Sequence, residues 1–301
     1  KTEHPSSLLA NNERAGRLFL KARKRSGELV PIGLRIGTNN TMSIERRHFF
    51  QRWYRRYTLV RRYRRMDVLI AVSHGVARDT ARLSNIPESA IHVIPNPTIP
   101  PELDRLANLP VDHPWFGDAA LPVILGVGRL ARPKGFDTLL RAFSKVREAF
   151  PCRLVLLGEG KLREELTALA KVLGVDQDVD LPGYVDNPFA YLARSSLFVL
   201  SSIWEGSPNV LIEALAMGVP AVSTDCPFGP REILQDGRVA PLVPVGDAEK
   251  MAKEMARVLK NPQSPNTLKA AVADYHPAVG AARYMAALGV GNGTHPEVSQ
   301  E

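Results

Sequence analysis

Two segments of the chain combine glycines, cations and carboxylates at spacings that suit the binding of a diphosphate. In the first, Gly128 and Arg129 follow a short apolar run, and Lys134 and Gly135 come later in the same loop. Glycine lets the backbone approach a ligand closely, and two cations can neutralise a diphosphate. The alternative is a tight turn with two solvated cations. The segment lacks the third glycine of a dinucleotide fingerprint and the Ser or Thr that follows the lysine of a Walker loop.

In the second segment, residues 201–218, two carboxylates stand in a loop and in the helix predicted after it. Ser207 suits the N-cap of that helix and Pro208 its first position, so the first turn offers free amides to an anion. Glu213 would lie ~7 Å along the axis, level with a sugar ring next to a phosphate bound at the helix tip. Glu205, in the loop, would face whatever lies beyond the phosphates. The alternative is a glycosidase with paired carboxylates, which rarely sets its acids beside a diphosphate site.

The elements that must position these loops alternate regularly from residue 122 onward. Short apolar runs are separated by amphipathic stretches, which is typical of a parallel sheet covered by helices on both faces. In such sheets, ligands bind in the loops that follow the carboxyl ends of the strands. The predicted strands are 122–127, 153–157, 178–181, 196–200 and 219–223, and the predicted helices are 137–149, 161–173, 187–194 and 208–217.

Before residue 122 the pattern is less regular. It predicts a helix from Ser6, strands over 31–36, 67–72 and 91–94, a helix over 44–65 and a helix from Ser73 to about Leu83. Residues 95–120 hold six prolines, which favours an interdomain linker over a core element.

Composition excludes disordered, collagen-like and disulfide-stabilised proteins. The 301 residues are 45% apolar and 23% charged, as in ordinary globular proteins, and the length suggests two domains. No apolar run approaches the ~18 residues that a membrane span needs, and residues 1–30 lack the pattern of a signal peptide. Two distant cysteines, Cys152 and Cys226, favour buried thiols in a reducing compartment over a disulfide or a metal site.

Charge is distributed unevenly along the chain. Residues 1–65 hold 17 Lys and Arg against 4 Asp and Glu, a net of +13, so the rest of the +8 chain carries −5. A strongly basic segment favours an anionic partner, whether nucleic acid, acidic lipid or a phosphorylated ligand.

Together, these motifs resemble the retaining glycosyltransferases of family four, which have the GT-B fold. The resemblance covers residues 66–260 and rests on the following segments: Gly128-Arg129, Lys134-Gly135, 156–160, 181–185, Glu205 and Glu213 with seven residues between them, 224–232 and 241–247. It implies an α/β protein with a Rossmann-like, doubly wound parallel-sheet domain over residues 106–275. This domain would bind the nucleotide-sugar donor. A partial Rossmann-like N-terminal domain over 1–105, a cross-over helix over 276–290 and a tail over 291–301 complete the expected organisation.

The resemblance implies a role for individual residues. The catalytic set would be Arg129 and Lys134, which neutralise the donor diphosphate as it leaves, and Glu205, which holds a hydroxyl of the transferred sugar. Glu213 would hold the ribose hydroxyls. The donor-binding set would comprise Gly128, Gly183, Tyr184 and Val185, of which 183–185 meet the nucleobase, together with Ser207, Pro208, Asn209, Val210 and Glu213.

The expected activity is that of a retaining hexosyltransferase of polysaccharide or lipid-linked oligosaccharide biosynthesis. It would move a sugar from a nucleotide-sugar, with UDP favoured by the resemblance alone, to a glycan or lipid-linked acceptor, without a metal or another cofactor. The alternative is a nucleotide-sugar-binding fragment or scaffold without activity. Asp176, Asp178 and Asp180 form two Asp-x-Asp pairs, a manganese-binding pattern in another glycosyltransferase class. They stand at the start of the predicted strand 178–181 and not at its end, so they are interpreted as a solvated turn.

Two features of the first 105 residues depart from or add to the family pattern. The family often carries His-Asn before a Thr-x-Ser stretch on the acceptor side, whereas Asn39 and Asn40 stand there in this chain. Asparagine can donate to a sugar oxygen but cannot act as a base. In addition, no Gly-rich loop precedes residue 66, so the N-terminal domain is expected to be incomplete.

The predicted helix over 44–65 places nine arginines among six aromatic side chains. Three interpretations are open: a solvated basic face, a nucleic-acid surface, and an interfacial helix that meets anionic lipid or a lipid diphosphate acceptor. No nucleic-acid-binding fold is visible, so the membrane interpretation is favoured and no nucleic-acid partner is expected. The protein would then be cytoplasmic and peripheral on the inner face of the cell membrane.

Overall fold

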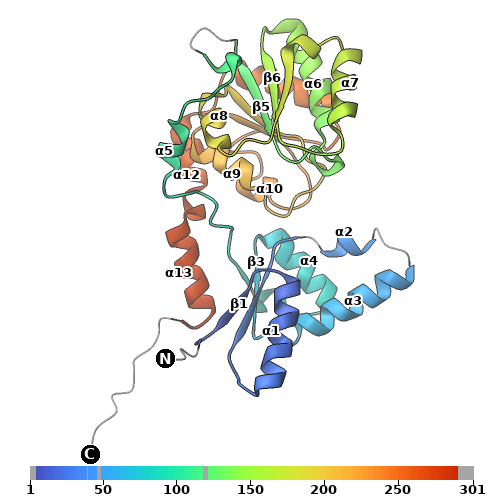
Figure 1. Ribbon diagram of the computed structural model, residues 1–301, viewed down its shortest axis with the longest axis vertical. Coiled ribbons are helices and arrows are strands. Elements are labelled where there is room, and N and C mark those ends of the chain that lie inside the picture. The colour runs from blue at the N-terminus through green and yellow to red at the C-terminus, as the bar shows by residue number, and fades with distance from the viewer. Residues whose placement is uncertain (1–4, 39, 46–48, 118–120, 291–301) are drawn as a thin grey trace, which may run out of the picture. The chain divides into compact units, whose positions relative to one another are not determined.

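The chain forms two compact units in the computed structural model, which describes residues 5–38, 40–45, 49–117 and 121–290 (Figure 1). The first unit comprises Lys1–Asn96 and Ala278–Glu301, and the second comprises Pro97–Pro277. The boundary expected after residue 105 therefore lies nearer the N-terminus, between Asn96 and Pro97. The two buried cysteines are free thiols, as predicted from their number and spacing.

The second unit is built on a parallel sheet with the strand order β10-β9-β8-β5-β6-β7. The chain runs outward from β5 to β7, returns to the other side of β5 and continues through β8 to β10. This reversal creates a switch point between β5 and β8, where open α/β sheets bind ligands. The strands are β5 (Val123–Val127), β6 (Arg153–Leu157), β7 (Val179–Gly183), β8 (Leu197–Leu200), β9 (Ala221–Thr224) and β10 (Leu242–Val243).

Helices cover both faces of this sheet because the strand residues alternate between two hydrophobic cores. Ile124 contributes to the core on one face and Leu125 to the core on the other, and the neighbouring strands follow the same period of two. On the first face lie α6 (Phe136–Ala149), α7 (Arg163–Val172) and α11 (Ala248–Lys260), and on the second lie α8 (Pro188–Arg194), α9 (Asn209–Ala216), α12 (Pro265–Ala271) and the short α10 (Pro230–Ile233).

The first unit is a smaller parallel sheet with the order β1-β2-β3-β4. Its strands are β1 (Leu8–Ala10), β2 (Ile32–Ile36), β3 (Val68–Ala71) and β4 (Ile91–Val93), and its helices include α1 (Glu13–Ser26) and α4 (His74–Ser84). The prediction of a helix from Ser6 was wrong for residues 8–10, which pair with β2. The helix begins only after Asn12, whose side chain accepts hydrogen bonds from the amides of Arg14 and Ala15.

The segment predicted as one helix over 44–65 contains α2 (Asn40–Glu45) and α3 (Phe49–Tyr63), separated by residues that lie outside the description. Leu59 and Tyr63 of α3 are buried in the core of the first unit, whereas Trp53 is 69% exposed. The helix therefore has one face fixed in the core and another in solvent.

Residues 95–120 are more than a linker, although their prolines suggested one. They include α5 (Leu103–Ala107) and a 3-10 turn, Pro114–Phe116, and Ile99 is buried in a core of the second unit. His113 anchors the turn, because its Nε2 lies 2.9 Å from Asp180 and its Nδ1 accepts from the amide of Trp115. From Pro97 onward, the segment therefore belongs to the second unit.

The chain returns to the first unit through α13 (Pro277–Ala287). A Cβ on Gly33 of β2 would lie 2.6 Å from Leu288, so the end of this segment packs closely against the sheet. Within the described part of the chain, none of the helices has the length and apolar character required to cross a bilayer.

Candidate active site

The loops that follow β5 and β8 meet at the switch point of the second unit. The β5 loop runs from Gly128 through the 3-10 turn Arg132–Lys134 to Gly135, and the β8 loop runs from Ser201 to Pro208. Ser201 donates to the carbonyl oxygen of Lys134 over 2.8 Å, and the amide of Ile203 donates to the carbonyl oxygen of Pro133 over 2.8 Å. These bonds fix one loop against the other.

Gly135 must be glycine for this arrangement. Its φ is +59°, in the left-handed region, and a Cβ would collide with the carbonyl oxygen of Ser201. Gly128 similarly leaves room for the side chain of Lys134, whose Cε would lie 3.1 Å from a Cβ at that position. The two glycines therefore let Lys134 lie along the backbone at the end of β5.

Lys134 and Glu205 form an ion pair across the two loops. The Lys134 Nζ lies 2.6 Å from the Glu205 Oε1, and the Ser202 hydroxyl donates to the same oxygen over 2.7 Å. Ser202 is in turn held by Thr224 at the end of β9, whose hydroxyl donates to its carbonyl oxygen over 2.6 Å. Both members of the pair are largely buried, so their charges are weakly screened.

Arg129 is the contrasting cation of the site. Its side chain is exposed, and it has no hydrogen-bond or ion-pair partner among the residues that the structure describes. A guanidinium left free in this way at the end of a central strand is available to an incoming anion.

A cavity of about 310 Å³ lies beside Gly128 and Arg129. It is here called the donor cavity, after the donor-binding role predicted from the sequence for Gly128, Tyr184 and Val185. Its walls come from the ends of β5, β6 and β7, and they are mainly apolar apart from Arg129 and Glu159. Tyr184, at the edge of the cavity, is 72% exposed, so its ring is accessible to a ligand. The lining residues are Val127, Gly128, Arg129, Leu157, Gly158, Glu159, Tyr184, Val185 and Pro188. Gly183, whose carbonyl oxygen accepts from the amide of Gly158 over 2.7 Å, lies just before this wall.

Helix α9 begins at Asn209, and Pro208 stands at its N-cap without a side-chain hydrogen bond. The prediction that Ser207 caps the helix was therefore wrong. Proline at the N-cap has no hydroxyl or carboxyl with which to bond the first amides, so they face the β8 loop without a side-chain cap. Val210 follows in the first turn.

Glu213 lies in the second turn of α9, between buried neighbours Ile212 and Ala214. Burial raises the pKa of its carboxyl to about 7, from an ordinary value of 4.5. Among the described residues, the carboxyl group has no hydrogen-bond or ion-pair partner. A largely buried carboxyl without a partner is costly to ionise, and a ligand that donates hydrogen bonds to it would offset that cost.

The acceptor-side pair falls in the first unit. Asn39 lies outside the described residues. Asn40 is 5% exposed, and its Nδ2 donates to the hydroxyl of Tyr63 over 2.6 Å. Its backbone amide and that of Thr41 donate to Asp79 over 3.1 and 3.3 Å. Asn40 therefore holds the start of α2 in place, and it lines a cavity of this unit.

The Asp-x-Asp run has partners within the fold. Asp178 accepts from Arg147 Nε over 2.8 Å and Asp180 contacts His113. No grouping of three or more His, Cys, Asp or Glu that could hold a metal occurs in the described part of the chain.

Sequence reasoning did not identify Ser202, Thr224 or Glu159 as parts of the site. Ser201 and Ser202 directly follow a buried apolar strand, and that change from apolar to hydroxyl side chains is a usable signal. Thr224 is recognisable only once β9 lies beside β8. Glu159 reaches the donor cavity through the pairing of β5 and β6.

Comparisons with known proteins find glycosyltransferases as the similar proteins. Residues 121–261 match the model described as Glycosyl transferases group 1, and residues 30–99 match Glycosyltransferase Family 4. Over 199 residues the chain is 31% identical to N-acetylgalactosamine-N,N'-diacetylbacillosaminyl-diphospho-undecaprenol 4-alpha-N-acetylgalactosaminyltransferase of Campylobacter jejuni, covering 66% of this chain and 52% of that protein. Over 212 residues it is 32% identical to the lipopolysaccharide core biosynthesis glycosyltransferase LpsE of Rhizobium meliloti, covering 70% and 58%.

Among solved structures, Anabaena Alr3699/HepE in complex with UDP and glucose aligns with a TM-score of 0.71 and 18% identity, covering 93% of this chain and 74% of that chain. This likeness concerns the fold. The chain spans just over half the length of the two curated relatives named above. The chain therefore carries a segment that matches Glycosyltransferase Family 4 over residues 30–99 and a segment that matches Glycosyl transferases group 1 over 121–261, and its fold is that of the GT-B glycosyltransferases.

Proposed function

We propose that this chain is a retaining glycosyltransferase that moves a sugar from a UDP-sugar to an acceptor. The observation that carries the proposal is the ion pair of Lys134 with Glu205 at the switch point, beside the donor cavity and the free Arg129. Two cations, one carboxylate and an apolar cavity match the three parts of a nucleotide-sugar: the diphosphate, the sugar and the base.

In this proposal each part of the site has a separate task. Arg129 and Lys134 neutralise the diphosphate, whose negative charge grows as its bond to the sugar breaks. Glu205 accepts a hydrogen bond from a sugar hydroxyl, and Glu213 accepts from the ribose. The base enters the donor cavity against Tyr184 and Val185. The acceptor hydroxyl attacks on the face that the diphosphate leaves and gives its proton to the departing diphosphate oxygen, so the anomeric configuration is retained.

The acceptor is proposed to be a glycan or a lipid-linked glycan at the inner face of the cell membrane. The Campylobacter relative carries a diphospho-undecaprenol substrate in its name and the Rhizobium relative acts in lipopolysaccharide core biosynthesis. Helix α3 supports a membrane contact, because Trp53, Tyr54 and Tyr57 are 69%, 65% and 49% exposed. Aromatic rings beside arginines are typical of helices that lie in a membrane interface.

The proposal is tested by adding UDP-, GDP- and ADP-sugars to the purified chain. Thermal stabilisation by UDP-sugars and release of UDP in the presence of lipid-linked acceptors are expected, and nuclear magnetic resonance of the product determines its anomeric configuration. Stabilisation without any UDP release would support the binding-fragment alternative. No response to any nucleotide-sugar would contradict the proposal as a whole.

Sugar transfer is expected to continue in EDTA. In this site the charge of the diphosphate would be met by Arg129, Lys134 and the first turn of α9, so no divalent cation is needed. Initial rates with and without EDTA should agree within about twofold, while a strict requirement for Mn²⁺ would contradict this assignment of the cations.

Membrane binding is expected to depend on the exposed arginines of α3. Arg62 bonds Glu13 and Arg64 bonds the carbonyl oxygen of Ser84, so those two serve the fold, whereas Arg52 and Arg56 are exposed. With about 1 kcal/mol for each arginine near an anionic surface, Arg52→Gln/Arg56→Gln should weaken binding to phosphatidylglycerol vesicles by up to about 30-fold.

The matched control for that variant is Arg78→Gln/Arg82→Gln. It removes the same charge from two exposed positions, also four residues apart, on α4 of the same unit. Vesicle sedimentation should give near-wild-type binding for this control. Equal losses in the two variants would mean that net charge, and not α3, attracts the membrane.

A further inference from the structure

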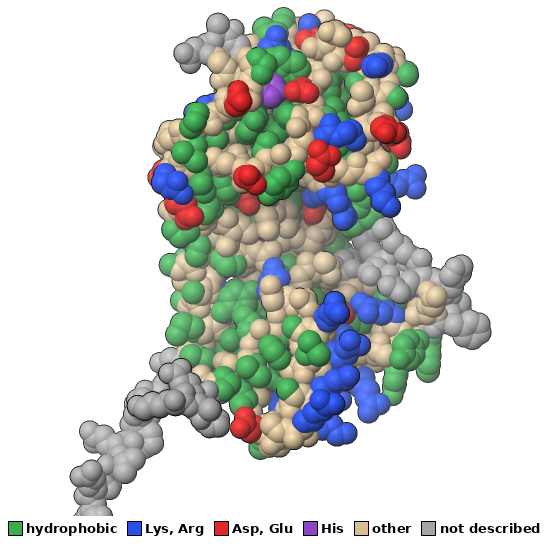
Figure 2. Space-filling view, viewed as in Figure 1, with side chains coloured by type: hydrophobic (Ala, Val, Ile, Leu, Met, Phe, Trp, Pro, Cys, Tyr) green, Lys and Arg blue, Asp and Glu red, His purple; other side chains and the backbone are tan. Residues whose placement is uncertain are grey.

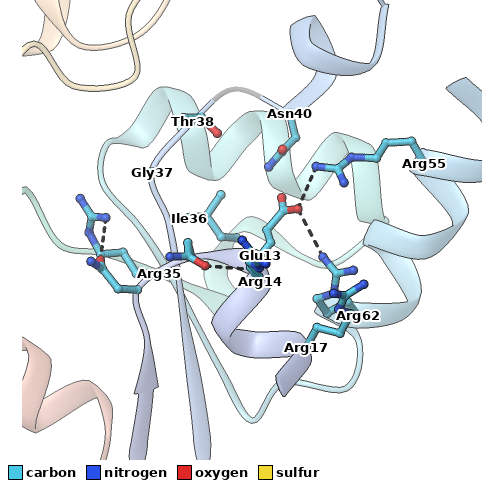
Figure 3. A pocket seen from close by; sticks show the side chains of 12 residues that line it. Glu13, Arg14, Arg17, Arg35, Ile36, Gly37, Thr38, Asn40, Arg55 and Arg62 are labelled. Atoms are coloured by element: carbon cyan, nitrogen blue, oxygen red, sulfur yellow. Dashed lines mark hydrogen bonds and ion pairs between the residues drawn. The ribbon is translucent and has the colours of Figure 1, made fainter. Parts of the chain in front are cut away.

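A cavity of about 780 Å³ in the first unit, here called the arginine cavity, is separate from every residue assigned to the donor. It opens where β1 and β2 end and where α1 begins (Figure 3). The described lining residues include arginines from three elements and a single carboxylate, Glu13, which leaves a net charge of +4 in their side chains. The arginines are Arg14 and Arg17 of α1, Arg35 of β2, and Arg55 and Arg62 of α3.

One wall of the arginine cavity is held by a hydrogen-bond network around Glu13. The Glu13 Oε2 accepts from Arg55 over 3.2 Å and from Arg62 over 3.3 Å, and its Oε1 accepts from the Tyr63 hydroxyl over 3.1 Å. Burial and the nearby Glu13 raise the pKa of Tyr63, so the hydroxyl stays protonated and can donate. This network fixes α3 against the start of α1 and orients its two arginines toward the cavity (Figure 3).

Several donors of the cavity are left over after this network is made. The side chains of Arg14 and Arg17 are exposed and have no hydrogen-bond or ion-pair partner in the described part of the chain. The Nε of Arg55 is buried and likewise lacks a hydrogen-bond partner there. A buried hydrogen-bond donor without an acceptor is costly to the folded state. On the surface, Figure 2 shows Lys and Arg side chains gathered over α1.

The side chains that line the arginine cavity restrict the class of ligand that it can bind. The described lining side chains include no aromatic ring on which a base could stack. The first amides of α1 are taken by Asn12, so binding would rely on the arginines, whose planar forks match phosphate oxygens. The Thr38 hydroxyl, also in the lining, offers a partner to a sugar.

We propose that the arginine cavity is a second phosphate site of this chain, which binds the phosphate or diphosphate group of a phosphorylated acceptor. The assignment of the anion to the acceptor rests on the proposed function, whereas the anion site itself does not. Arg14 and Arg17 supply the free charge, Arg55 and Arg62 are already positioned, and Glu13 prevents repulsion between the α3 arginines when the cavity is empty.

Calorimetric titration of the whole chain with inorganic pyrophosphate tests this site. Saturating UDP is present to occupy the second unit. Pyrophosphate should still bind the wild-type chain, and Arg14→Gln/Arg17→Gln should weaken it at least tenfold without changing the affinity for UDP. The matched control, Arg78→Gln/Arg82→Gln on α4, should stay within twofold of wild type, and a circular dichroism spectrum checks that each variant is folded.

The anion site would be contradicted if saturating UDP abolished pyrophosphate binding, or if the control variant weakened pyrophosphate binding as much as Arg14→Gln/Arg17→Gln. It would also be contradicted if the chain bound phosphatidylglycerol vesicles but no soluble pyrophosphate. The last would mean that bulk lipid headgroups are the anion. Pyrophosphate binding without any sugar transfer would uphold the anion site and count against the proposed function. Sugar transfer without pyrophosphate binding would count against the anion site and uphold the proposed function.

Discussion

Replacing either Arg129 or Lys134 by alanine is expected to lower the turnover number for sugar transfer by about 100-fold or more, the usual cost of losing one preorganised charge stabiliser. Arg129 is exposed and free among the described residues, so its loss should hardly alter the folded protein. Lys134 is paired with Glu205 at 2.6 Å, so its loss also leaves a largely buried carboxylate without its cation. Lys134→Ala should therefore lower thermal stability as well as turnover.

Arg132→Ala is the matched control for both variants. Arg132 is an exposed cation of the same loop, between Arg129 and Lys134, and it does not line the donor cavity. Steady-state rates with a UDP-sugar should leave Arg132→Ala within about twofold of wild type. Arg129→Lys adds a second comparison, because lysine keeps the charge but cannot form two parallel bonds to a phosphate. Wild-type turnover in Arg129→Ala or Lys134→Ala would contradict the assignment of the diphosphate to this loop.

The sheet of the second unit was predictable because its strands are buried on both faces. Residues such as 122–127 and 196–200 read as short apolar runs, and the structure has β5 (Val123–Val127) and β8 (Leu197–Leu200) at these positions. Their order could not be read from the chain, since the reversal at β5 depends on how the helices pack. The rule that ligands bind at strand ends nevertheless selected loops that lie together at one edge of the sheet, because parallel strands all end at one edge.

The first unit was harder to predict for a different physical reason. Leu8 and Leu9 match a helical spacing with Ala15 and Leu18. Residues 8–10 nevertheless form a strand that pairs with β2, and helix α1 begins only after its N-cap residue, Asn12. Local pattern cannot weigh a partner strand that lies more than twenty residues away in the sequence. The prolines of 95–120 led to the prediction of a linker for the same reason, because composition carries no information on how a segment packs against the second unit.

The candidate site divides along a similar line. Residues proposed to act through their own charge, such as Lys134 and Glu205, were predicted from type and spacing. Residues that act by holding others, such as Ser202 and Thr224, were not, because their role exists only through contacts between strands. The arginines of α1 were counted as part of a basic segment, but the cavity they line appears only when α1 and α3 are packed together.

Glu213→Gln is expected to stabilise the empty protein at pH 8 by up to about 3 kcal/mol. Burial raises the pKa of the Glu213 carboxyl from 4.5 to about 7, and each pKa unit corresponds to about 1.36 kcal/mol. Because the folded state holds the proton more tightly than the unfolded state, Glu213 costs nothing below pH 4.5. The cost grows as the pH rises to about 7 and is constant above it. Glutamine removes this ionisation.

Urea unfolding at pH 5 and pH 8 measures the effect. The free energy of unfolding of the wild-type chain should fall relative to Glu213→Gln between these two pH values, and the difference should be small at pH 5. A difference that is the same at both pH values would mean that the substitution acts through packing and not through the carboxyl charge.

Donor binding should change in the opposite direction, because the ionised carboxylate is the form that accepts hydrogen bonds from two ribose hydroxyls. The affinity of the wild-type chain for UDP-glucose should therefore rise between pH 6 and pH 8, whereas Glu213→Gln should bind more weakly at pH 8 and show a flatter profile. UDP-glucose is the appropriate probe, since the terminal phosphate of UDP itself titrates near pH ~6. A variant that gained stability yet kept wild-type affinity at every pH would show that Glu213 faces no ribose. The buried charge would then need another explanation than the donor, and the assignment of α9 to the nucleotide would lose its support.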